Sequence, residues 1–212
     1  MQITLAAATG TEINTTVEWL KTQDINVEAL VTGIGGTITA YTLTKHIRDH
    51  RPGLVIQAGI GGSFAEALPP GSMAFIKEEV FADLGAIDED GLVDIFDLGL
   101  AGANDTPFNN KSLINPGLDR WKKYGLPFVK GATINCVSST KQQVQRITEK
   151  YNPAVESMEG AALHYVCLQE GIDFIQLRAI SNFAGERDKK KWKMKESIEL
   201  LNHQLKKIIA EL

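Results

Sequence analysis

The chain has 212 residues, a formal net charge of −4, and 43% hydrophobic and 23% charged residues. These values are ordinary for a soluble globular protein, and the length suits one α/β domain with a sizeable core, which we expect to span residues 1–212. The negative charge and the lack of a basic stripe with interleaved aromatic residues argue against a nucleic-acid partner. No apolar run is long enough to cross a bilayer, so we expect no membrane partner either.

The first residues and the cysteines indicate the cellular compartment. Met1-Gln2-Ile3 has neither the basic segment nor the long apolar run of a secretory signal, which predicts a cytoplasmic protein. Cys136 and Cys167 lack metal-ligand spacing and are typical of small buried apolar residues. We therefore expect no bound metal ion.

The first third of the chain repeats the order strand, polar or glycine-rich turn, helix. Apolar runs predict strands at residues 3–8, 26–31 and 54–58. Helices are predicted after the first two strands, one opened by Thr9-Gly10-Thr11-Glu12 and one ending near residue 50. This rhythm predicts a three-layer α/β fold, with a mixed, mainly parallel sheet flanked by helices.

Two glycine clusters follow the second and third strands, Gly33-Ile34-Gly35-Gly36 and Gly59-Ile60-Gly61-Gly62. Neither is a dinucleotide fingerprint, because the last glycine of that motif would fall on Ile38 or Phe64, and no Gly-Lys-Ser/Thr follows. We therefore expect no nucleotide cofactor. The clusters are interpreted as tight strand exits that also let a ligand approach the backbone at the carboxyl ends of the strands.

The rest of the chain continues the pattern less regularly. A strand at 72–80 is followed by a weakly periodic segment, 83–110, expected to be mostly loop with one or two short strands and to form the rim of a pocket. The later predicted elements are a short helix at 113–124, a strand at 128–137, a helix at 140–151, a strand at 174–180 and a long C-terminal helix.

The segment Val155-Glu156-Ser157-Met158-Glu159-Gly160 places two carboxylates three residues apart, where a short strand leads into a helix. Apolar residues recur at helical spacing after Gly160, so Glu159 is predicted at the helix start. Backbone N–H groups and the helix dipole stabilise a carboxylate there. An ordinary first-turn acid is the alternative interpretation of Glu159.

Together with the glycine clusters and Glu12, two motifs resemble the purine nucleoside phosphorylase / methylthioadenosine nucleosidase superfamily: Met158-Glu159-Gly160-Ala161-Ala162 and Leu177-Arg178-Ala179-Ile180-Ser181-Asn182. The resemblance spans nearly the whole chain. Within the superfamily, the segments around Asp83, Glu159 and Asn182 are similar to the family of futalosine hydrolases. This similarity implies a phosphate-independent nucleosidase that releases hypoxanthine from futalosine in menaquinone biosynthesis.

The resemblance also implies roles for individual residues. Glu159 would accept hydrogen bonds from the ribose hydroxyls, and Glu12 would activate the attacking water; without the resemblance, Thr9-x-x-Glu12 is a capping box. Arg178 is expected to support the site, although a structural ion pair is the alternative. The substrate-binding residues implied in this way are Gly59, Ile60, Gly61, Asn135, Cys136, Val137, Ser157, Met158, Glu159 and Phe183.

Asn182 departs from the methylthioadenosine nucleosidases, which carry an Asp that acts as general acid at this position. An Asn cannot supply a proton, but its NH₂ group can donate a hydrogen bond to N7 or O6 of a 6-oxopurine. The departure therefore favours hypoxanthine and leaves protonation of the departing base to water. An Asn in the turn after a strand is also common for structural reasons.

Three further expectations remain open. The absence of Arg before Arg48 favours water over phosphate as the nucleophile, because phosphorylases bind phosphate through cationic side chains. A methylthioadenosine/S-adenosylhomocysteine-type nucleosidase and a non-catalytic nucleoside-binding protein are the alternative functions. We also expect a homodimer or higher homo-oligomer, because relatives complete the 5′ pocket with a loop from a neighbouring subunit.

Overall fold

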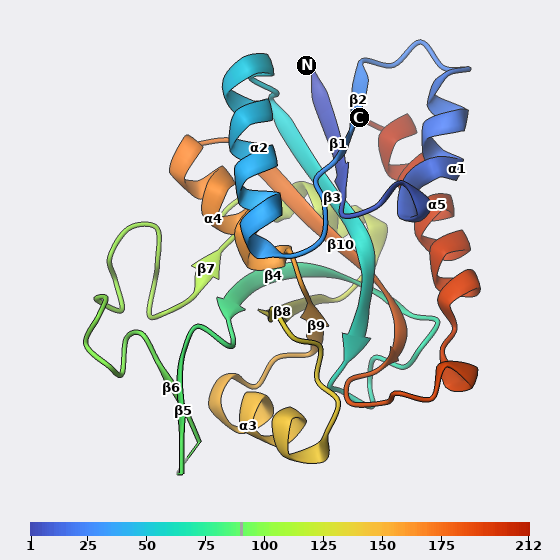
Figure 1. The fold of residues 1–212 in the computed structure, drawn as a ribbon. Helices are drawn as coiled ribbons and strands as arrows, with labels where there is room; N and C mark the ends of the chain where they lie inside the picture. Colours follow the sequence, from blue (N-terminus) through green and yellow to red (C-terminus); the bar gives the residue numbers. More distant parts are fainter. Residues whose placement is uncertain (90) are drawn as a thin grey trace.

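The computed structural model describes residues 1–89 and 91–212, so residue 90 of the predicted 83–110 loop lies outside the described residues. Its centre is an eight-stranded sheet in the order β10-β4-β8-β9-β3-β1-β2, with β7 paired to β4 (Figure 1). The strands of this sheet are β1 (Ile3–Ala7), β2 (Val27–Val31), β3 (Leu54–Ser63), β4 (Met73–Phe81), β7 (Leu113–Ile114), β8 (Phe128–Thr133), β9 (Val155–Ser157) and β10 (Asp173–Phe183).

The sheet is mixed and mainly parallel, as the sequence predicts. The pairs β1–β2, β1–β3, β3–β10, β4–β8 and β8–β9 are parallel, and the pairs β4–β10, β3–β9 and β4–β7 are antiparallel. Because β3 pairs with both β9 and β10, the strands β3, β10, β4, β8 and β9 close into a ring of hydrogen-bonded neighbours. The ring brings β9 and β10 to opposite sides of β3.

Helices cover both faces of the sheet. The helices are α1 (Gly10–Leu20), α2 (Gly36–His50), α3 (Lys141–Tyr151), α4 (Gly160–Glu170) and α5 (Met194–Ala210), with 3₁₀ turns η1 (Asp119–Tyr124) and η2 (Lys189–Lys191). Figure 1 shows α2 and α4 side by side on one face and α1 and α5 on the other. No helix among the described residues has the length and apolarity that a membrane span requires.

The two faces have separate cores because side chains alternate along the strands. Ile56 packs in the cluster that includes Leu205 of α5, whereas the adjacent Val55 packs with Leu43 of α2 and Leu163 of α4. A small hairpin of β5 (Gly85–Asp88) and β6 (Gly91–Asp94) lies outside the main sheet, as expected for the 83–110 segment.

Three predicted boundaries were wrong. The strand at 54–58 continues to Ser63, because its glycines pair with β9 and β10 instead of turning. Residues 113–124 do not form one helix, since Pro116-Gly117 separates β7 from η1. The strand at 128–137 ends at Thr133, so the Asn135-Cys136-Val137 segment is a turn and Cys136 is exposed rather than buried.

Gly160 provides a test of packing at the start of α4. A Cβ atom there would lie 1.9 Å from Glu79 Oε1 and 2.4 Å from Gln176 Nε2, both on fully buried side chains. We expect Gly160→Ala to lower the free energy of unfolding by about 1–3 kcal/mol through overpacking. Helix propensity alone predicts the opposite sign, since Ala is favoured over Gly by about 0.5–1 kcal/mol.

Gly36→Ala is the matched control, because Gly36 also begins a helix and its added Cβ would meet nothing closer than 3.9 Å. Urea unfolding of the three proteins measures the difference. If Gly160→Ala were as stable as Gly36→Ala, the proposed packing around Glu79 would be wrong.

Candidate active site

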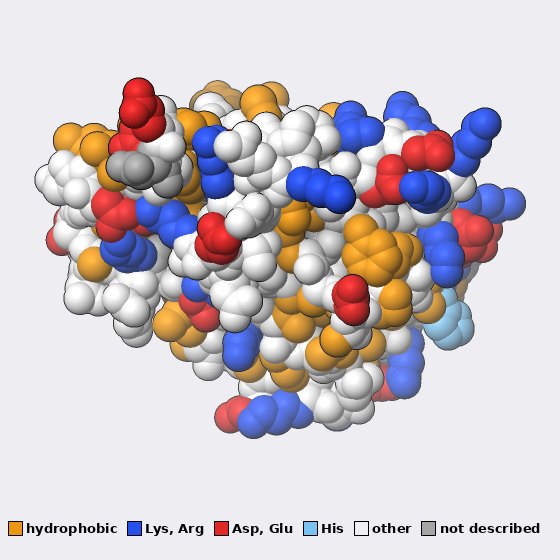
Figure 2. Space-filling view, turned by 90° about the horizontal axis from the view of Figure 1, so that it is seen from below, with side chains coloured by type: hydrophobic (Ala, Val, Ile, Leu, Met, Phe, Trp, Pro, Cys, Tyr) orange, Lys and Arg blue, Asp and Glu red, His pale blue; other side chains and the backbone are white. Residues whose placement is uncertain are grey.

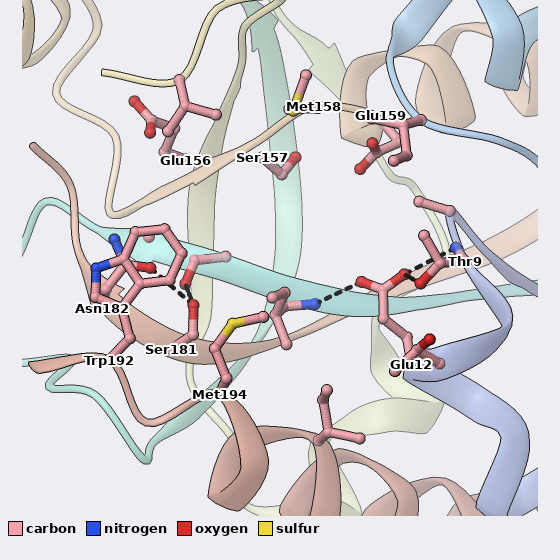
Figure 3. A pocket seen from close by; sticks show the side chains of 18 residues that line it. Thr9, Glu12, Glu156, Ser157, Met158, Glu159, Ser181, Asn182, Trp192 and Met194 are labelled. Carbon is pink, nitrogen blue, oxygen red and sulfur yellow. Dashed lines mark hydrogen bonds between the residues drawn. The ribbon is translucent and has the colours of Figure 1, made fainter. Parts of the chain in front are cut away.

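A cavity of about 420 Å³ lies where β1, β3 and β10 end and where α1 and α4 begin. Figure 2 shows the molecule from below, with hydrophobic side chains gathered in the central part of this face. The lining residues named in the following paragraphs come from segments distant in sequence, and Figure 3 shows them around one space. Among the sequence-predicted site residues, those that line the cavity are Glu12, Ile60, Gly61, Val137, Ser157, Met158, Glu159 and Asn182.

Glu12 reaches the cavity from the first turn of α1 and is only 8% exposed. Its Oε2 accepts hydrogen bonds from the backbone N of Thr9 at 3.0 Å and from Thr9 Oγ1 at 3.1 Å. Its Oε1 accepts from the backbone N of Ile60 at 3.1 Å, on β3. The capping box is therefore present, and the same carboxylate also ties α1 to β3 at the cavity wall.

Glu159 occupies the N-cap position of α4, as predicted, and is 5% exposed. Its Oε1 accepts a hydrogen bond from the backbone N of Gly35 at 3.1 Å. Gly35 has a φ of +92°, a conformation that favours glycine, so the direction of this N–H depends on the glycine cluster after β2. The loop after β2 thus fixes one oxygen of the carboxylate.

Arg178 lies beneath the cavity and is 2% exposed. Its Nη2 lies 3.6 Å from Glu159 Oε2 and donates to Gln57 Oε1 at 3.0 Å, while Nη1 donates to the carbonyl of Ile60 at 3.3 Å. A Cβ on Gly59 would lie 2.4 Å from Arg178 Nη1 and 2.9 Å from Glu12 Oε1. The missing side chain of Gly59 therefore lets the guanidinium approach the region of both carboxylates.

Asn182 lines the opposite end of the cavity near the end of β10. Its Oδ1 accepts from Ser181 Oγ at 2.8 Å, and its Nδ2 donates to the carbonyl of Phe183 at 2.8 Å. An amide NH₂ group has two hydrogens, so one remains to donate to a ligand. The local bonds fix which side of the amide carries the donor.

Three predicted substrate-binding residues are exposed and are not among those that line the cavity. Asn135 is exposed, and its Nδ2 donates to Asp83 Oδ1 at 3.0 Å. Cys136 is exposed in the same turn, and Phe183 is 41% exposed beyond the end of the strand. Gly59 and Arg178 are also absent from the lining, but they support it from below.

The prediction missed an aromatic wall. Trp192 lines the cavity from the segment that leads into α5, and Met194 and Ile198 line it from the start of α5. Trp192 is fixed by a hydrogen bond from its Nε1 to the carbonyl of Glu186 at 3.0 Å. The sequence carries one signal for this wall, the tryptophan directly after Lys189-Lys190-Lys191. A large aromatic residue within a charged surface segment indicates a binding surface more than a place in the hydrophobic core.

A potential metal cluster lies elsewhere, where β2 meets the last turn of α2. Ligand atoms of Glu28, His46 and His50 lie within 4.8 Å of one another. The two imidazole rings are stacked at 4.4 Å with an interplanar angle of 13°, so a single ion cannot lie in the plane of both rings. His46 Nε2 also lies 2.8 Å from Thr4 Oγ1, a contact that would be lost on metal binding.

Glu79 lies among buried polar residues behind the start of α4. It is fully buried and accepts from Gln176 Nε2 at 2.9 Å and from Thr133 Oγ1 at 3.0 Å. Burial raises its pKa from 4.5 to about 7, while Gln176, Arg178 and Thr133 act in the opposite direction. The neutral form of Glu79 is therefore populated in the folded protein at pH values where an exposed glutamate is ionised.

Comparison with known proteins identifies the class to which this fold and cavity belong. Residues 15–212 match the model of the Phosphorylase superfamily. The chain is 31% identical to a futalosine hydrolase of Thermus thermophilus over 86% of this chain and 80% of the relative. It is 30% identical to a futalosine hydrolase of Streptomyces coelicolor, over 97% and 88%. The chain belongs to the Phosphorylase superfamily and, within it, to the futalosine hydrolase family, which confirms the resemblance.

Solved structures agree on the fold. A 5′-methylthioadenosine/S-adenosylhomocysteine nucleosidase of Helicobacter pylori, in complex with butyl-thio-DADMe-Immucillin-A, has a TM-score of 0.83 at 20% identity, covering 100% of this chain and 99% of that chain. The native futalosine hydrolase of H. pylori also has a TM-score of 0.83, at 19% identity and with 100% and 98% coverage. The predicted nucleoside phosphorylase-like fold class is confirmed.

The buried charge state of Glu79 predicts a pH-dependent stability. Between pH 4.5 and about 7 the unfolded chain loses this proton while the folded chain keeps it, so the contribution of Glu79 to stability falls as pH rises. We expect the free energy of unfolding of the wild type, relative to Glu79→Gln, to decrease by about 1–3 kcal/mol over this range. Urea titrations at several pH values measure the difference.

Glu78→Gln is the control with the opposite sign. The pKa of Glu78 is lowered, because its bonds to Lys130 and Ser112 outweigh the effect of burial. Its stabilising contribution should therefore be present above its ordinary pKa and be lost as pH falls. A difference between wild type and Glu79→Gln that does not change with pH would contradict the assignment.

Proposed function

We propose that the protein hydrolyses the N-glycosidic bond of futalosine, releasing hypoxanthine and dehypoxanthine futalosine, in menaquinone biosynthesis. The observation that carries this proposal is the arrangement of one cavity with the buried side chains of Glu12 and Glu159 at one end and of Asn182 at the other. Membership of the futalosine hydrolase family supports the choice of substrate.

Glu159 is proposed to bind the ribose. Cleavage of the bond gives the sugar oxocarbenium character, so a fixed carboxylate next to the ring stabilises the transition state. A carboxylate has about four acceptor positions, of which Gly35 N–H and the contact with Arg178 occupy two. The remaining positions can accept from the vicinal hydroxyls, with Met158 against the sugar.

Glu12 is proposed to position the attacking water and to accept its proton. The three hydrogen bonds from Thr9 and Ile60 fix the carboxylate and leave acceptor capacity toward the cavity. A base held in one place in this way typically contributes about 10²–10⁴ in rate. Capping and catalysis are compatible, because the same bonds that cap α1 orient the base.

Water is favoured over phosphate as the nucleophile by the charge of the cavity. Among the described residues, its lining includes three glutamates and no Lys or Arg side chain. A phosphate dianion needs cationic groups, and Arg178, the buried cation nearest the carboxylates, already contacts Glu159, Gln57 and Ile60. We therefore propose hydrolysis that requires neither phosphate nor a cofactor.

At the base end, Asn182 is proposed to donate its free amide hydrogen to the purine. Because the amide cannot provide a proton, a water molecule completes protonation of the departing base. A methylthioadenosine/S-adenosylhomocysteine-type reaction is less well supported, although related nucleosidases match at 26–30% identity over 76% of this chain. A binding protein without activity is disfavoured by the presence of both Glu12 and Glu159 in the cavity.

One assay tests this function. The protein is incubated with futalosine, inosine and methylthioadenosine in phosphate-free buffer, and the released bases are separated by chromatography. Hypoxanthine released from futalosine in preference to the other two substrates is the expected result. Release of adenine from methylthioadenosine alone, or a strict requirement for phosphate, would overturn the proposal.

The carboxylates predict the outcome of conservative substitution. We expect Glu12→Gln and Glu159→Gln each to lower kcat for futalosine by about 10²–10⁴, since both groups act on the reacting centre. Circular dichroism and thermal unfolding check that the variants are folded. Glu18→Gln, which changes an exposed glutamate on the same helix, is the control and should retain full activity. Near-wild-type activity of Glu12→Gln would reduce the role of this residue to helix capping.

We also propose that the protein is a cytoplasmic homo-oligomer. Several large apolar side chains of the α2 region are exposed, among them Tyr41 at 72% and Ile38 at 54%. Tyr41 also lines a shallow groove together with Tyr165 and Val166 of α4. We expect light scattering at micromolar concentration to give at least twice the chain mass of 23.2 kDa. A monomer at this concentration would contradict the proposal.

A further inference from the structure

Glu156 is a cavity residue to which the proposed mechanism gives no role. It lies in β9, lines the cavity and is 4% exposed. Its Oε1 accepts from the backbone N of Ser138 at 3.3 Å, and the Ser138 side chain also stabilises the carboxylate, whereas Oε2 is buried without a hydrogen-bond partner among the described residues. Buried polar atoms are nearly always paired, so an orphaned carboxylate oxygen on a cavity wall indicates a donor on the ligand.

The register of the sheet places Glu156 opposite Asn182 across one glycine. Gly62 of β3 pairs with Glu156 on β9 and with Asn182 on β10. Directly opposed residues of neighbouring strands project from the same face of a sheet, and neighbouring strands lie about 4.8 Å apart. The Cα atoms of Glu156 and Asn182 are therefore about 10 Å apart, and Gly62, the residue between them, has no side chain.

This gap lies at one end of the cavity. Figure 3 shows Glu156, Asn182 and Trp192 together, with Glu12 and Glu159 at the other end. A Cβ added to Gly62 would lie 3.5 Å from Asn182 Nδ2, so the glycine leaves the floor of the gap open. The indole of Trp192 adds a flat apolar surface, which suits the face of a purine.

The two polar groups bordering the gap have complementary hydrogen-bonding character. Asn182 has a free donor, because its amide is oriented by Ser181 and Phe183. Burial raises the pKa of Glu156, and in its ionised form this residue offers a free acceptor at Oε2. A 6-oxopurine presents an acceptor at O6 next to a donor at N1–H. A 6-aminopurine presents the reverse, a donor at its amino group next to an acceptor at N1.

We propose that Glu156 determines the base specificity of this site by accepting the N1–H of a 6-oxopurine through Oε2, while Asn182 donates to O6. A 6-aminopurine in the same place would set its N1 lone pair against the carboxylate and its amino group against the amide of Asn182. The inference deepens the proposed function, because it assigns the recognition of the base in the same cavity.

Glu156→Gln tests the inference with little change in shape. With its Oε1 still bound to Ser138 N–H, the new Nε2 group replaces Oε2 and offers a donor where the carboxylate offered an acceptor. A charge-assisted hydrogen bond is worth about 1.5–3 kcal/mol, so we expect kcat/KM for futalosine to fall about 10- to 100-fold. The 6-amino analogue with the same 5′ group should lose less or gain, which reverses or reduces the preference.

The ratio of kcat/KM for the two nucleosides is the deciding quantity, and calorimetry with free hypoxanthine and free adenine is the second readout. Glu149→Gln, on the surface of α3, is the control and should leave both unchanged. An equal loss for both bases in Glu156→Gln would indicate a structural role and overturn the inference. Wild-type values of kcat/KM for both nucleosides would overturn it as well.

A second variant covers the case in which Glu156→Gln fails to fold. Glu156→Asp keeps the charge but withdraws the oxygen from the gap, so binding of hypoxanthine should weaken without a gain for adenine. Retention of full hypoxanthine binding by Glu156→Asp would contradict the inference. The calorimetry also separates the two proposals, because wild type that fails to cleave futalosine but prefers hypoxanthine to adenine refutes only the proposed reaction.

Discussion

The site depends on one buried cation. Arg178 lies in β10 under the cavity floor, where its guanidinium contacts Glu159 and reaches the glycine that adjoins Glu12. Glu12 and Glu159 are buried carboxylates at the same end of the cavity, and like charges at such a distance repel each other. A guanidinium remains charged at any pH the protein meets, so Arg178 places a permanent positive charge 3.6 Å from the Glu159 carboxylate.

Glycines make this arrangement possible. Gly59 leaves room for the guanidinium, Gly62 leaves the gap between Glu156 and Asn182, and Gly35 turns its N–H toward Glu159. In the extended part of β3 the use of glycine reflects close approach of neighbouring groups, not a turn. The ring of strands around β3 places β10 beside Gly59 and both β9 and β10 beside Gly62.

The buried glutamates differ in how their oxygens are satisfied, and the differences suggest separate tasks. Glu12 and Glu159 are held by backbone N–H groups at the end of the cavity where we propose that the sugar binds. Glu79 is enclosed behind α4 by Gln176 and Thr133 and has a pKa raised to about 7 by burial, which suits a structural residue. Among the described residues, nothing donates a hydrogen bond to one oxygen of Glu156, which suits a residue that binds a ligand.

The sequence by itself determined the order of the main elements, the mixed and mainly parallel sheet, the superfamily, and the segments that carry Glu12, Glu159 and Asn182. These features follow from local periodicity and from motifs that are contiguous in the chain. The roles of these three residues stay predictions until the variants are measured.

Only the tertiary structure decided which neighbours each residue meets. The continuation of β3 through its glycines depends on pairing with β9 and β10, which are about 100 residues away in the chain. The exposure of Cys136, the aromatic wall at Trp192 and the position of Glu156 opposite Asn182 likewise depend on strand register and on packing between distant segments. Such contacts have no local signal, because register is fixed by what the whole sheet buries and not by the sequence of one strand.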